Sequence, residues 1–207
     1  MISLRVSRRG RPVFDDVSLS LGAGQALRVE GPNGSGKSTF LKAVAGLLAP
    51  DAGSVRWVDE DGGDGVGQRR ASTLYIGHRA ALRDDLSAAE NLRLSLALSG
   101  HAARPGELDD AARTWGLGEV WHRHARELSA GQRRRVALAR LSVSFRPLWL
   151  LDEPSAALDR HGIATLRDAM TTQLARGGIV VYAAHDEFAA HRGDTACLRL
   201  EPSRAFH

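Results

Sequence analysis

The sequence predicts an α/β fold in which a mostly parallel sheet is covered by helices on both faces. A glycine-rich stretch, 31–38, lies between a strand-like segment and a helix-like segment. Two apolar stretches, 147–152 and 178–185, have the length of buried strands and flank a helix-like segment near 160–175. Strands that alternate with helices form parallel sheets, because each crossover helix packs against a face of the sheet.

Local patterns predict the elements around the glycine-rich stretch. Strand-like residues precede it within 2–6 and 25–30, on either side of a turn-rich stretch. The helix that follows it should stop near 49–53, where proline and glycine interrupt the pattern. The apolar residues of this helix recur at helical spacing: Phe40, Leu41, Val44, Leu47 and Leu48.

The middle of the chain combines short strands with a helical region. Residues 54–76 should form short strands around the acidic run 59–67. This run lacks the glutamate that closes a calcium-binding loop, so we expect a flexible hairpin connection there. Residues 87–127 should be helical, because Ser87 and Glu90 can form a capping box ahead of an apolar pattern.

This helical pattern is interrupted at "GHAARPG" and resumes over 107–125. His122 and His124 lie in the resumed part. They have no further candidate ligands nearby in the sequence, so we expect surface or packing histidines rather than a metal site.

Length and composition favour one globular domain. The chain has 207 residues, enough to bury a core without disulfides, and 43% of them are hydrophobic. The mean hydropathy is −0.23. No apolar run approaches the ~20 residues of a membrane span, and the N-terminus lacks the apolar core of a secretory signal. The single cysteine, Cys197, cannot form an internal disulfide, which fits a reducing cytoplasm.

The formal net charge of +4 and the pI of about 9.9 allow two interpretations. Nucleic acid or an anionic membrane surface would attract a basic protein. A compositional bias toward arginine explains the same values, since Lys37 and Lys42 are the only lysines. No interleaved aromatic residues offer a stacking platform for bases. We therefore favour the compositional bias and expect no nucleic-acid partner, while a basic surface near a membrane partner stays compatible.

The strongest motif is the glycine-rich stretch, which matches G-x-x-x-x-G-K-[ST] between a strand and a helix. Its glycines let backbone N–H groups point into one concavity, and the following helix adds its positive N-terminal end. Lys37 would bring a charge to the outer phosphates of a bound ligand, and Ser38 an oxygen ligand to Mg²⁺. The expected phosphate-binding residues are Gly31, Pro32, Asn33, Gly34, Ser35, Gly36, Lys37, Ser38 and Thr39.

Two acidic residues stand at the end of the apolar stretch 147–152: Asp152 is its last residue, and Glu153 follows directly. A carboxylate at the C-terminal edge of a buried parallel strand faces the ligand crevice. We expect Asp152 to hold Mg²⁺, mainly through water. Glu153 is expected to orient or deprotonate the attacking water. Such an acid pair is a weak signal alone and a strong one beside the glycine-rich loop.

A second anion site is expected at the start of the segment "LSAGQRRRVALAR", 128–140. Ser129 and Gln132 can form a capping box, which marks a helix N-terminus with free backbone N–H groups. An ordinary capped helix explains the same residues, so both interpretations stay open from the pattern alone.

These three motifs, in this order, resemble the nucleotide-binding subunit of an ABC transporter over nearly the whole chain. "LSAGQ" is similar to the family's signature, with Ala130 in place of a glycine, and 155–159, "SAALD", is similar to its D-loop. His185 in "AAHD" stands where the family has its switch histidine. The resemblance implies a P-loop NTPase fold with a RecA-like core and a small antiparallel β region. It also implies a single domain, 1–207, with an inserted helical subdomain at about 79–140.

The resemblance further implies a head-to-tail homodimer that hydrolyses ATP with Mg²⁺. Each ATP would lie between the glycine-rich loop of one chain and the "LSAGQ" helix of the other. Glu153 and His185 would be the catalytic residues, and His185 would contact the γ-phosphate and the attacking water. The residues implied to meet the partner's ATP are Ser129, Ala130, Gly131 and Gln132, with Asp159 in the D-loop of the dimer.

Two positions depart from the family's pattern. The family usually stacks adenine on an aromatic residue near the N-terminus, and here Arg8 or Arg9 stands at about that position, with Phe14 as an alternative. His78, in "YIGHRAAL", stands in place of the Q-loop glutamine, which senses Mg²⁺ and links the site to the membrane partner. Because Mg²⁺ prefers oxygen ligands, we expect a water-mediated contact for His78 rather than direct ligation.

The run 75–92, together with "LSAGQRRRVALARL" and "PLWLLDEP", is similar to a narrower family. This is the family of ATP-binding subunits of the haem exporter used in bacterial c-type cytochrome maturation. The resemblance implies a peripheral position on the cytoplasmic face of the bacterial inner membrane, beside integral membrane transporter subunits. It associates ATP hydrolysis with haem delivery, or with release of haem from a periplasmic chaperone. The sequence holds no convincing haem ligand pair, and we expect no direct haem site.

Three other functions are compatible with parts of this pattern. The ATPase subunit of another small transporter, for a drug, a lipid or a metal, fits the motifs outside His78 equally well. A soluble ABC-type ATPase that acts on ribosomes or DNA usually carries two ATPase units or long coiled-coil insertions, and this sequence has neither. A P-loop kinase for a small molecule would leave "LSAGQ" and His185 unexplained.

Overall fold

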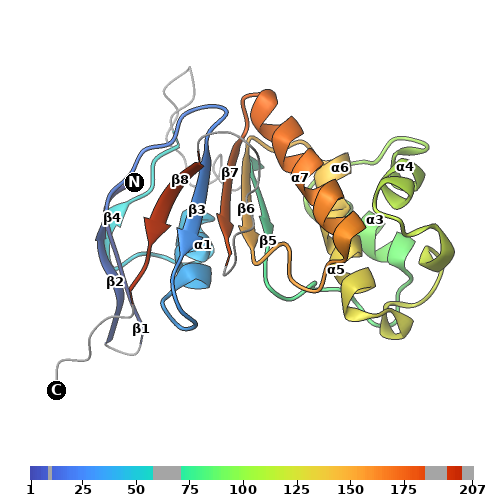
Figure 1. Cartoon of the computed structure of the whole chain (residues 1–207), viewed down its shortest axis with the longest axis horizontal. Coiled ribbons are helices and arrows are strands. Elements are labelled where there is room, and N and C mark those ends of the chain that lie inside the picture. Colours follow the sequence, from blue (N-terminus) through green and yellow to red (C-terminus); the bar gives the residue numbers. More distant parts are fainter. Residues whose placement is uncertain (9–10, 58–70, 185–194, 202–207) are drawn as a thin grey trace.

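Two sheets organise the chain, for which a computed structural model describes residues 1–8, 11–57, 71–184 and 195–201 (Figure 1). The smaller sheet is antiparallel, with the strand order β2-β1-β4. The larger has the order β5-β6-β7-β3-β8, and every neighbouring pair in it is parallel, which confirms the predicted fold class. The strands are β1 (Ile2–Arg8), β2 (Arg11–Val17), β3 (Ala26–Glu30), β4 (Ala52–Ser54), β5 (Thr73–Ile76), β6 (Leu148–Asp152), β7 (Ile179–Ala183) and β8 (Thr195–Arg199).

Strand β6 illustrates how the parallel sheet is buried on both faces. Successive side chains of a strand point to opposite faces of the sheet. Trp149 and Leu151 belong to one core cluster, which the helices on one side of the sheet complete. Leu148 and Leu150 belong to a second cluster, which α1 and the antiparallel sheet complete. All four side chains are buried, and for this reason the strand is a continuous apolar run in the sequence.

The helices lie on both sides of the parallel sheet, as predicted (Figure 1). Ser87 begins α3 with the expected capping box: Ser87 Oγ accepts from Glu90 N at 3.2 Å, and Glu90 Oε2 accepts from Ser87 N at 2.8 Å. No helix in the described ranges is long and apolar enough to cross a membrane. The helices are α1 (Lys37–Val44), α3 (Ala88–Leu98), α4 (Glu107–Thr114), α5 (Ala130–Leu138), α6 (Arg140–Val143) and α7 (Arg160–Ala175), with 3₁₀ turns η1 (Gly118–Val120) and η2 (Ala125–Glu127).

The first helix ends earlier than its apolar pattern predicts. Helix α1 ends at Val44, and Gly46 follows with a φ of 71°. The N–H of Leu47 then donates to Lys42 O at 2.9 Å, which closes the helix in a left-handed glycine cap. Leu47 and Leu48 therefore lie exposed and do not continue the buried face.

Two other predictions of local structure are wrong. Helix α4 ends at Thr114 and does not continue through 125, because Gly116 follows it with a φ of 61° and short 3₁₀ turns take over. Strands β4 and β5 do not form a hairpin with each other, since β4 pairs with β1 and β5 pairs with β6. The acidic run 59–67 lies outside the described residues.

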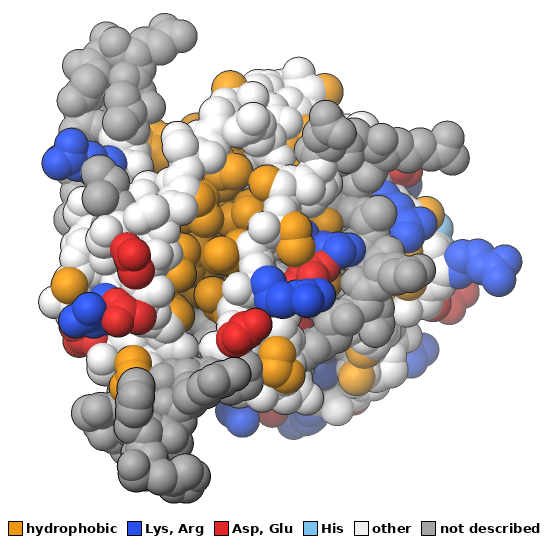
Figure 2. Space-filling model, turned by 60° about the vertical axis from the view of Figure 1, so that its left-hand side comes forward, with side chains coloured by type: hydrophobic (Ala, Val, Ile, Leu, Met, Phe, Trp, Pro, Cys, Tyr) orange, Lys and Arg blue, Asp and Glu red, His pale blue; other side chains and the backbone are white. Residues whose placement is uncertain are grey.

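Arginines of the two sheets are paired with neighbouring acids. Figure 2 shows hydrophobic side chains gathered in the middle of one face, with basic and acidic side chains beside them. Arg5 Nε lies 2.6 Å from Asp15 Oδ1, and Arg199 Nη2 lies 3.7 Å from Glu30 Oε2. Arg28 also pairs with Glu30. Two carboxylates thus balance part of the charge of three arginines, in line with the compositional interpretation of the positive net charge.

Candidate nucleotide-binding site

The glycine-rich loop connects the C-terminal end of β3 to the start of α1. Gly36 caps α1 with a φ of 99°, and a Cβ atom there would collide with Val13 of β2. Gly31 has a φ of 145°, and a Cβ atom there would collide with the backbone oxygen of Leu200. L-residues with a side chain rarely adopt such φ values. The loop can therefore fit between β2 and the end of β8 only with glycine at these two positions.

Lys37 folds back over the loop that precedes it. Its Nζ donates to Gly31 O at 2.7 Å and to Pro32 O at 3.1 Å. Burial lowers the pKa of Lys37, and the nearby charges of Glu153 and Asp152 oppose that shift. The ammonium group thus lies within electrostatic reach of both acids at the end of β6, held by bonds that an incoming phosphate can replace.

Two buried oxygen atoms near the loop have no hydrogen-bond partner among the described residues. They are Ser35 Oγ in the loop and Asp152 Oδ1 at the end of β6. Both residues are almost fully buried. Since buried polar atoms in folded proteins are normally paired, these two are available to a bound group. Ser38, which is half-buried in the first turn of α1, adds a hydroxyl to the site.

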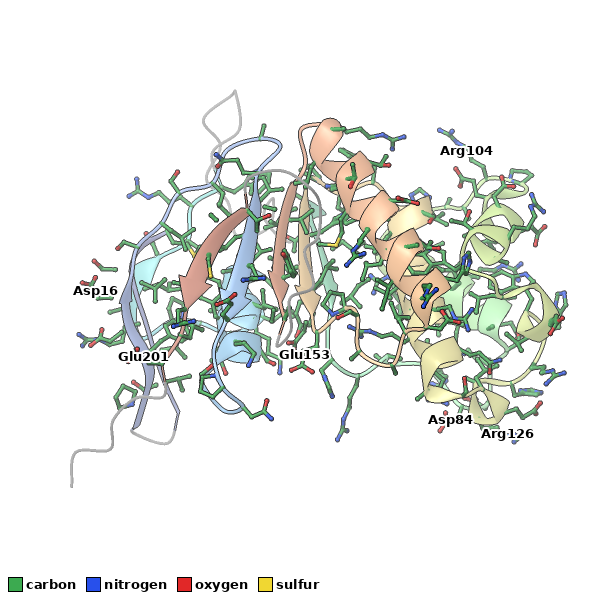
Figure 3. The ribbon with its side chains drawn as sticks, in the orientation of Figure 1. Asp16, Asp84, Arg104, Arg126, Glu153 and Glu201 are labelled. Atoms are coloured by element: carbon green, nitrogen blue, oxygen red, sulfur yellow. The ribbon has the colours of Figure 1, made fainter. Side chains whose placement is uncertain are left out.

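Glu153 leaves the end of β6 in a strained backbone conformation. Its φ of 49° lies in the left-handed region, which costs energy in a residue with a side chain. Its N–H donates to Ala183 O at 3.0 Å, which fixes the turn against β7. The turn directs the carboxylate to the open end of the sheet, where Figure 3 labels it.

His78 lies directly beside this carboxylate. Its Nδ1 is 3.1 Å from Glu153 Oε2, and its side chain is 63% exposed. The glutamate side chain is 26% exposed, so the pair lies at the rim of the site. A neutral imidazole can donate one hydrogen bond to the carboxylate and still offer an acceptor nitrogen. The structure therefore brings together the two residues that the sequence placed in separate motifs.

A buried arginine behind this pair was missed by the sequence analysis. Arg134 of α5 is only 4% exposed, and its guanidinium donates to backbone carbonyls of two separate chain segments. Burial lowers the pKa of Arg134, while the charges of Asp152 and Glu153 oppose the shift. Three successive arginines occupy 133–135, and nothing in that run indicates which of them is buried.

The start of α5 carries the capping box that the sequence predicts. Ser129 Oγ accepts from Gln132 N at 3.2 Å, and Gln132 Oε1 accepts from Ser129 N at 2.8 Å. Within the described chain, the N–H groups of Ala130 and Gly131 remain as donors at the helix start. In Figure 1, α5 lies in the helical part of the molecule, whereas α1 lies among the strands. One chain thus holds its two candidate anion sites apart.

Gly131 is in close contact with the segment after β6. A Cβ atom at this position would lie 2.6 Å from Ala157 O, far inside van der Waals distance. Ala157 has a φ of 61°, and its backbone is turned toward α5. A contact within the chain therefore requires glycine at position 131 of "LSAGQ", whereas position 130 accommodates the side chain of alanine.

Gly131→Ala is expected to destabilise the protein by about 1–3 kcal/mol, because the added methyl group must displace the Ala157 backbone. Unfolding in urea measures the loss. Gly118→Ala is the control, because a Cβ atom at Gly118 would meet nothing within 4 Å. Equal stability of the two variants would contradict the close contact.

Asp159 ends the 155–159 segment and caps α7. Its Oδ1 accepts from Gly162 N at 2.8 Å, and this backbone hydrogen bond lowers the pKa of Asp159. Arg135 Nη2 lies 3.5 Å from Asp159 Oδ2, so α5 and α7 are linked at this point. Asp159, the last residue of the segment that resembles a D-loop, thus contacts both α5 and α7.

The candidate for adenine stacking at Phe14 is wrong. Phe14 is only 6% exposed and packs edge-on against Phe40, with ring centroids 5.8 Å apart. Its ring is part of the core and offers no face to a base. The side chain of Arg8, together with Arg9 and His185, lies outside the described part of the chain.

The histidines of the helical region form no metal site. Among the residues that the structure describes, no group of three or more His, Cys, Asp or Glu side chains could hold a metal ion. His124 and His122 are both exposed, and His124 Nδ1 lies 3.0 Å from Asp85 O. Both side chains lie on the surface, which is one of the two placements that the sequence led us to expect.

Comparisons with known sequences agree with the motifs. A family model described as "ABC transporter" matches residues 14–156. A "Cytochrome c biogenesis ATP-binding export protein CcmA" of Rhizobium meliloti (strain 1021) is 46% identical over 184 residues, covering 86% of this chain and 87% of the relative. The protein of the same name from Methylococcus capsulatus is 42% identical over 201 residues, covering 95% of each chain.

Solved structures share the fold. The ATP-binding subunit of an ABC transporter superposes with a TM-score of 0.77 at 26% identity, covering 89% of this chain and 78% of that chain. An ATP-binding cassette in a dimeric, post-hydrolysis state with bound ADP and Pi superposes with a TM-score of 0.78 at 24% identity, covering 98% and 94%. The latter shows similarity of fold alone.

Proposed function

This chain belongs to the ABC transporter family and, within it, to the cytochrome c biogenesis ATP-binding export proteins, and on that premise we propose how its residues use ATP. The protein binds and hydrolyses ATP as the ATPase subunit of that export system. The observation that carries the proposal is the meeting of Lys37, Asp152 and Glu153 at one edge of the parallel sheet, where both acids act electrostatically on the lysine. This edge is the C-terminal edge, at which ligands bind in such folds.

The phosphates of ATP would occupy the glycine-rich loop, 31–39. Lys37 Nζ would exchange its two backbone carbonyl partners for the outer phosphates, and the N-terminus of α1 would add its partial positive charge. The unpartnered oxygen of Asp152 and the hydroxyl of Ser38 are hard oxygen donors, which fit Mg²⁺. Bound there, Mg²⁺ would neutralise charge on the phosphates.

Glu153 is the proposed general base. Its carboxylate is only partly exposed and is aimed by the strained turn after β6 toward the phosphate end of the site. It would orient the attacking water and accept its proton as the water oxygen bonds to the γ-phosphorus. The bond from that phosphorus to the β–γ bridging oxygen would break, and ADP would be the leaving group. His185 is proposed to stabilise the charge that develops on the γ-phosphate.

His78→Gln is expected to retain most of the ATPase activity, and His78→Ala to lose much of it. The reason is the 3.1 Å contact between His78 Nδ1 and Glu153 Oε2, which an amide can replace and a methyl group cannot. Steady-state hydrolysis rates of the two variants measure the difference. Replacement of the exposed His122 by alanine is the control. Full ATPase activity in His78→Ala would show that His78 has no role in hydrolysis.

The second half of each site is proposed to come from another copy of the chain. The donors at the start of α5, Ser129 to Gln132, would meet the γ-phosphate of the ATP that the partner's glycine-rich loop holds. Asp159 would lie near the interface between the two copies. The separation of α1 and α5 within one chain supports this arrangement, because two chains complete two sites (Figure 1).

We propose that the homodimer associates peripherally with integral membrane subunits, on the cytoplasmic face of a bacterial inner membrane. Residues 79–140, which contain α3, α4 and α5, would form the helical subdomain inserted in the single domain 1–207. Hydrolysis would drive haem export or the release of haem from a chaperone. Co-purification tests this: a haem-handling membrane partner supports the assignment, and an unrelated permease overturns it.

A further inference from the structure

We propose that Arg134 is a positioning residue for ATP hydrolysis, which holds the backbones of Glu153 and His78 in one fixed arrangement. The inference rests on the proposed role of Glu153 as general base. Arg134 itself is placed behind the acids, on α5, and acts through the peptide groups that it binds.

The hydrogen bonds of Arg134 use its whole guanidinium group. Nε donates to Pro154 O at 3.3 Å. Nη2 donates to Asp152 O at 2.7 Å and to Glu153 O at 2.8 Å. Nη1 donates to Gly77 O at 2.7 Å and, more weakly, to the neighbouring His78 O at 3.4 Å. Every donor nitrogen therefore has a carbonyl partner, and these partners come from two separate segments of chain.

The first segment is the turn that carries the general base. Glu153 has a positive φ, and such a conformation persists only when the surroundings fix it. On one side its N–H donates to Ala183 O, and on the other its carbonyl accepts from Arg134. These two bonds clamp both peptide groups of the strained residue, and they set the direction of its carboxylate.

The second segment is the loop after β5 that carries His78. Arg134 binds the carbonyl of Gly77 just before it, at the exit from the sheet. The same guanidinium thus fixes the backbones of both partners of the His78–Glu153 contact. Their side chains meet at 3.1 Å although the two residues are 75 positions apart in the sequence, and the rigid planar guanidinium of Arg134 bridges the two backbones.

Arg134 also ties this arrangement to the start of α5. It lies five residues after Ser129, which is about one and a half helical turns. A shift of α5 would therefore move the Gly77 and Glu153 peptides together with the capped N-terminus. By this route, contact of the "LSAGQ" residues with a partner's ATP would be transmitted to the base within the same chain.

Lysine cannot replace this group. An ammonium offers three donors from a single point, whereas the guanidinium offers five in a fixed plane. Arg134→Lys keeps the positive charge beside Asp152 and Glu153 and removes the bridge between the two segments. The matched control is Arg133→Lys, one position earlier on α5, because Arg133 binds Asp84 and Ala125 O in the helical part of the molecule.

The test is steady-state ATP hydrolysis by both variants, below their unfolding temperatures. Arg134→Lys is expected to lower kcat by about 100-fold, as a misplaced catalytic group does, with the KM for ATP within about threefold. Arg133→Lys should leave both constants near the wild-type values. Equal kcat values for the two variants, or a raised KM with unchanged kcat in Arg134→Lys, would overturn the proposal.

Two further measurements distinguish a failure of the role proposed for Arg134 from loss of the fold and from a failure of the role proposed for Glu153. Urea unfolding shows whether Arg134→Lys keeps its fold, and loss of the folded state would also overturn the proposal, because Arg134 would then be a structural residue. Glu153→Gln is assayed alongside. If that variant hydrolyses ATP at the wild-type rate, the role of Glu153 fails, whereas an inactive Glu153→Gln with an unaffected Arg134→Lys rejects the role of Arg134 alone.

Discussion

Glu153→Gln should lower the kcat for ATP hydrolysis by about 100-fold or more and leave the affinity for ATP within a few-fold. A general base contributes roughly 10²–10⁴ to the rate, and an amide cannot accept the proton of the attacking water. The phosphate-binding loop is untouched by the substitution. Phosphate release measures turnover, and equilibrium binding of a fluorescent ATP analogue measures affinity.

The geometry around Glu153 makes this variant a clean test. Glutamine has the same size and can still lie beside His78 Nδ1, so the strained turn and its hydrogen bond to Ala183 O should persist. Glu119→Gln, at an exposed position in η1, is the control for loss of one negative charge. Unchanged hydrolysis by Glu153→Gln would remove this residue from the mechanism.

Lys37→Ala should weaken ATP binding by about 10- to 100-fold and lower turnover with it. Charge-assisted hydrogen bonds contribute roughly 1.5–3 kcal/mol, and 1.4 kcal/mol is a factor of ten in affinity. Lys42→Ala is a closely matched control, since it replaces the only other lysine of the chain, which lies exposed on the same helix. Isothermal titration with ATP compares the two variants.

The free protein should tolerate the loss of Lys37. Among the described residues, its ammonium donates hydrogen bonds to the carbonyls of Gly31 and Pro32, and water can reach those carbonyls from the open side of the loop. Similar unfolding midpoints for Lys37→Ala and Lys42→Ala would show that any loss of affinity is local. Equal ATP affinities in the two variants would contradict the placement of the phosphates.

The sequence predicted the parallel sheet well, because each buried strand is an uninterrupted apolar run. It predicted helix ends less well. The apolar pattern of α1 continues through Leu48, but the helix ends at Val44 and is capped by Gly46. In the same way, α4 ends just before Gly116. In both cases a single left-handed glycine outweighed the apolar periodicity.

In the candidate site, too, the sequence predicted some residues and not others. Local motifs indicated Lys37, Asp152 and the capping box at Ser129, since each is defined by neighbours in the sequence. The contact of His78 with Glu153 and the burial of Arg134 depend on pairing of distant segments, and no local pattern carries that information. The prediction that adenine stacks on Phe14 was wrong, because the ring packs on Phe40 in a tertiary contact that the local sequence does not show.

Completion of each ATP site by two chains is the central claim, and the mass of Glu153→Gln in solution tests it most directly. This variant should bind ATP without removing it by hydrolysis. Light scattering should give twice the 22.3 kDa of one chain with ATP and Mg²⁺, and a single chain with ADP. A particle that keeps the mass of one chain at saturating ATP would contradict the claim.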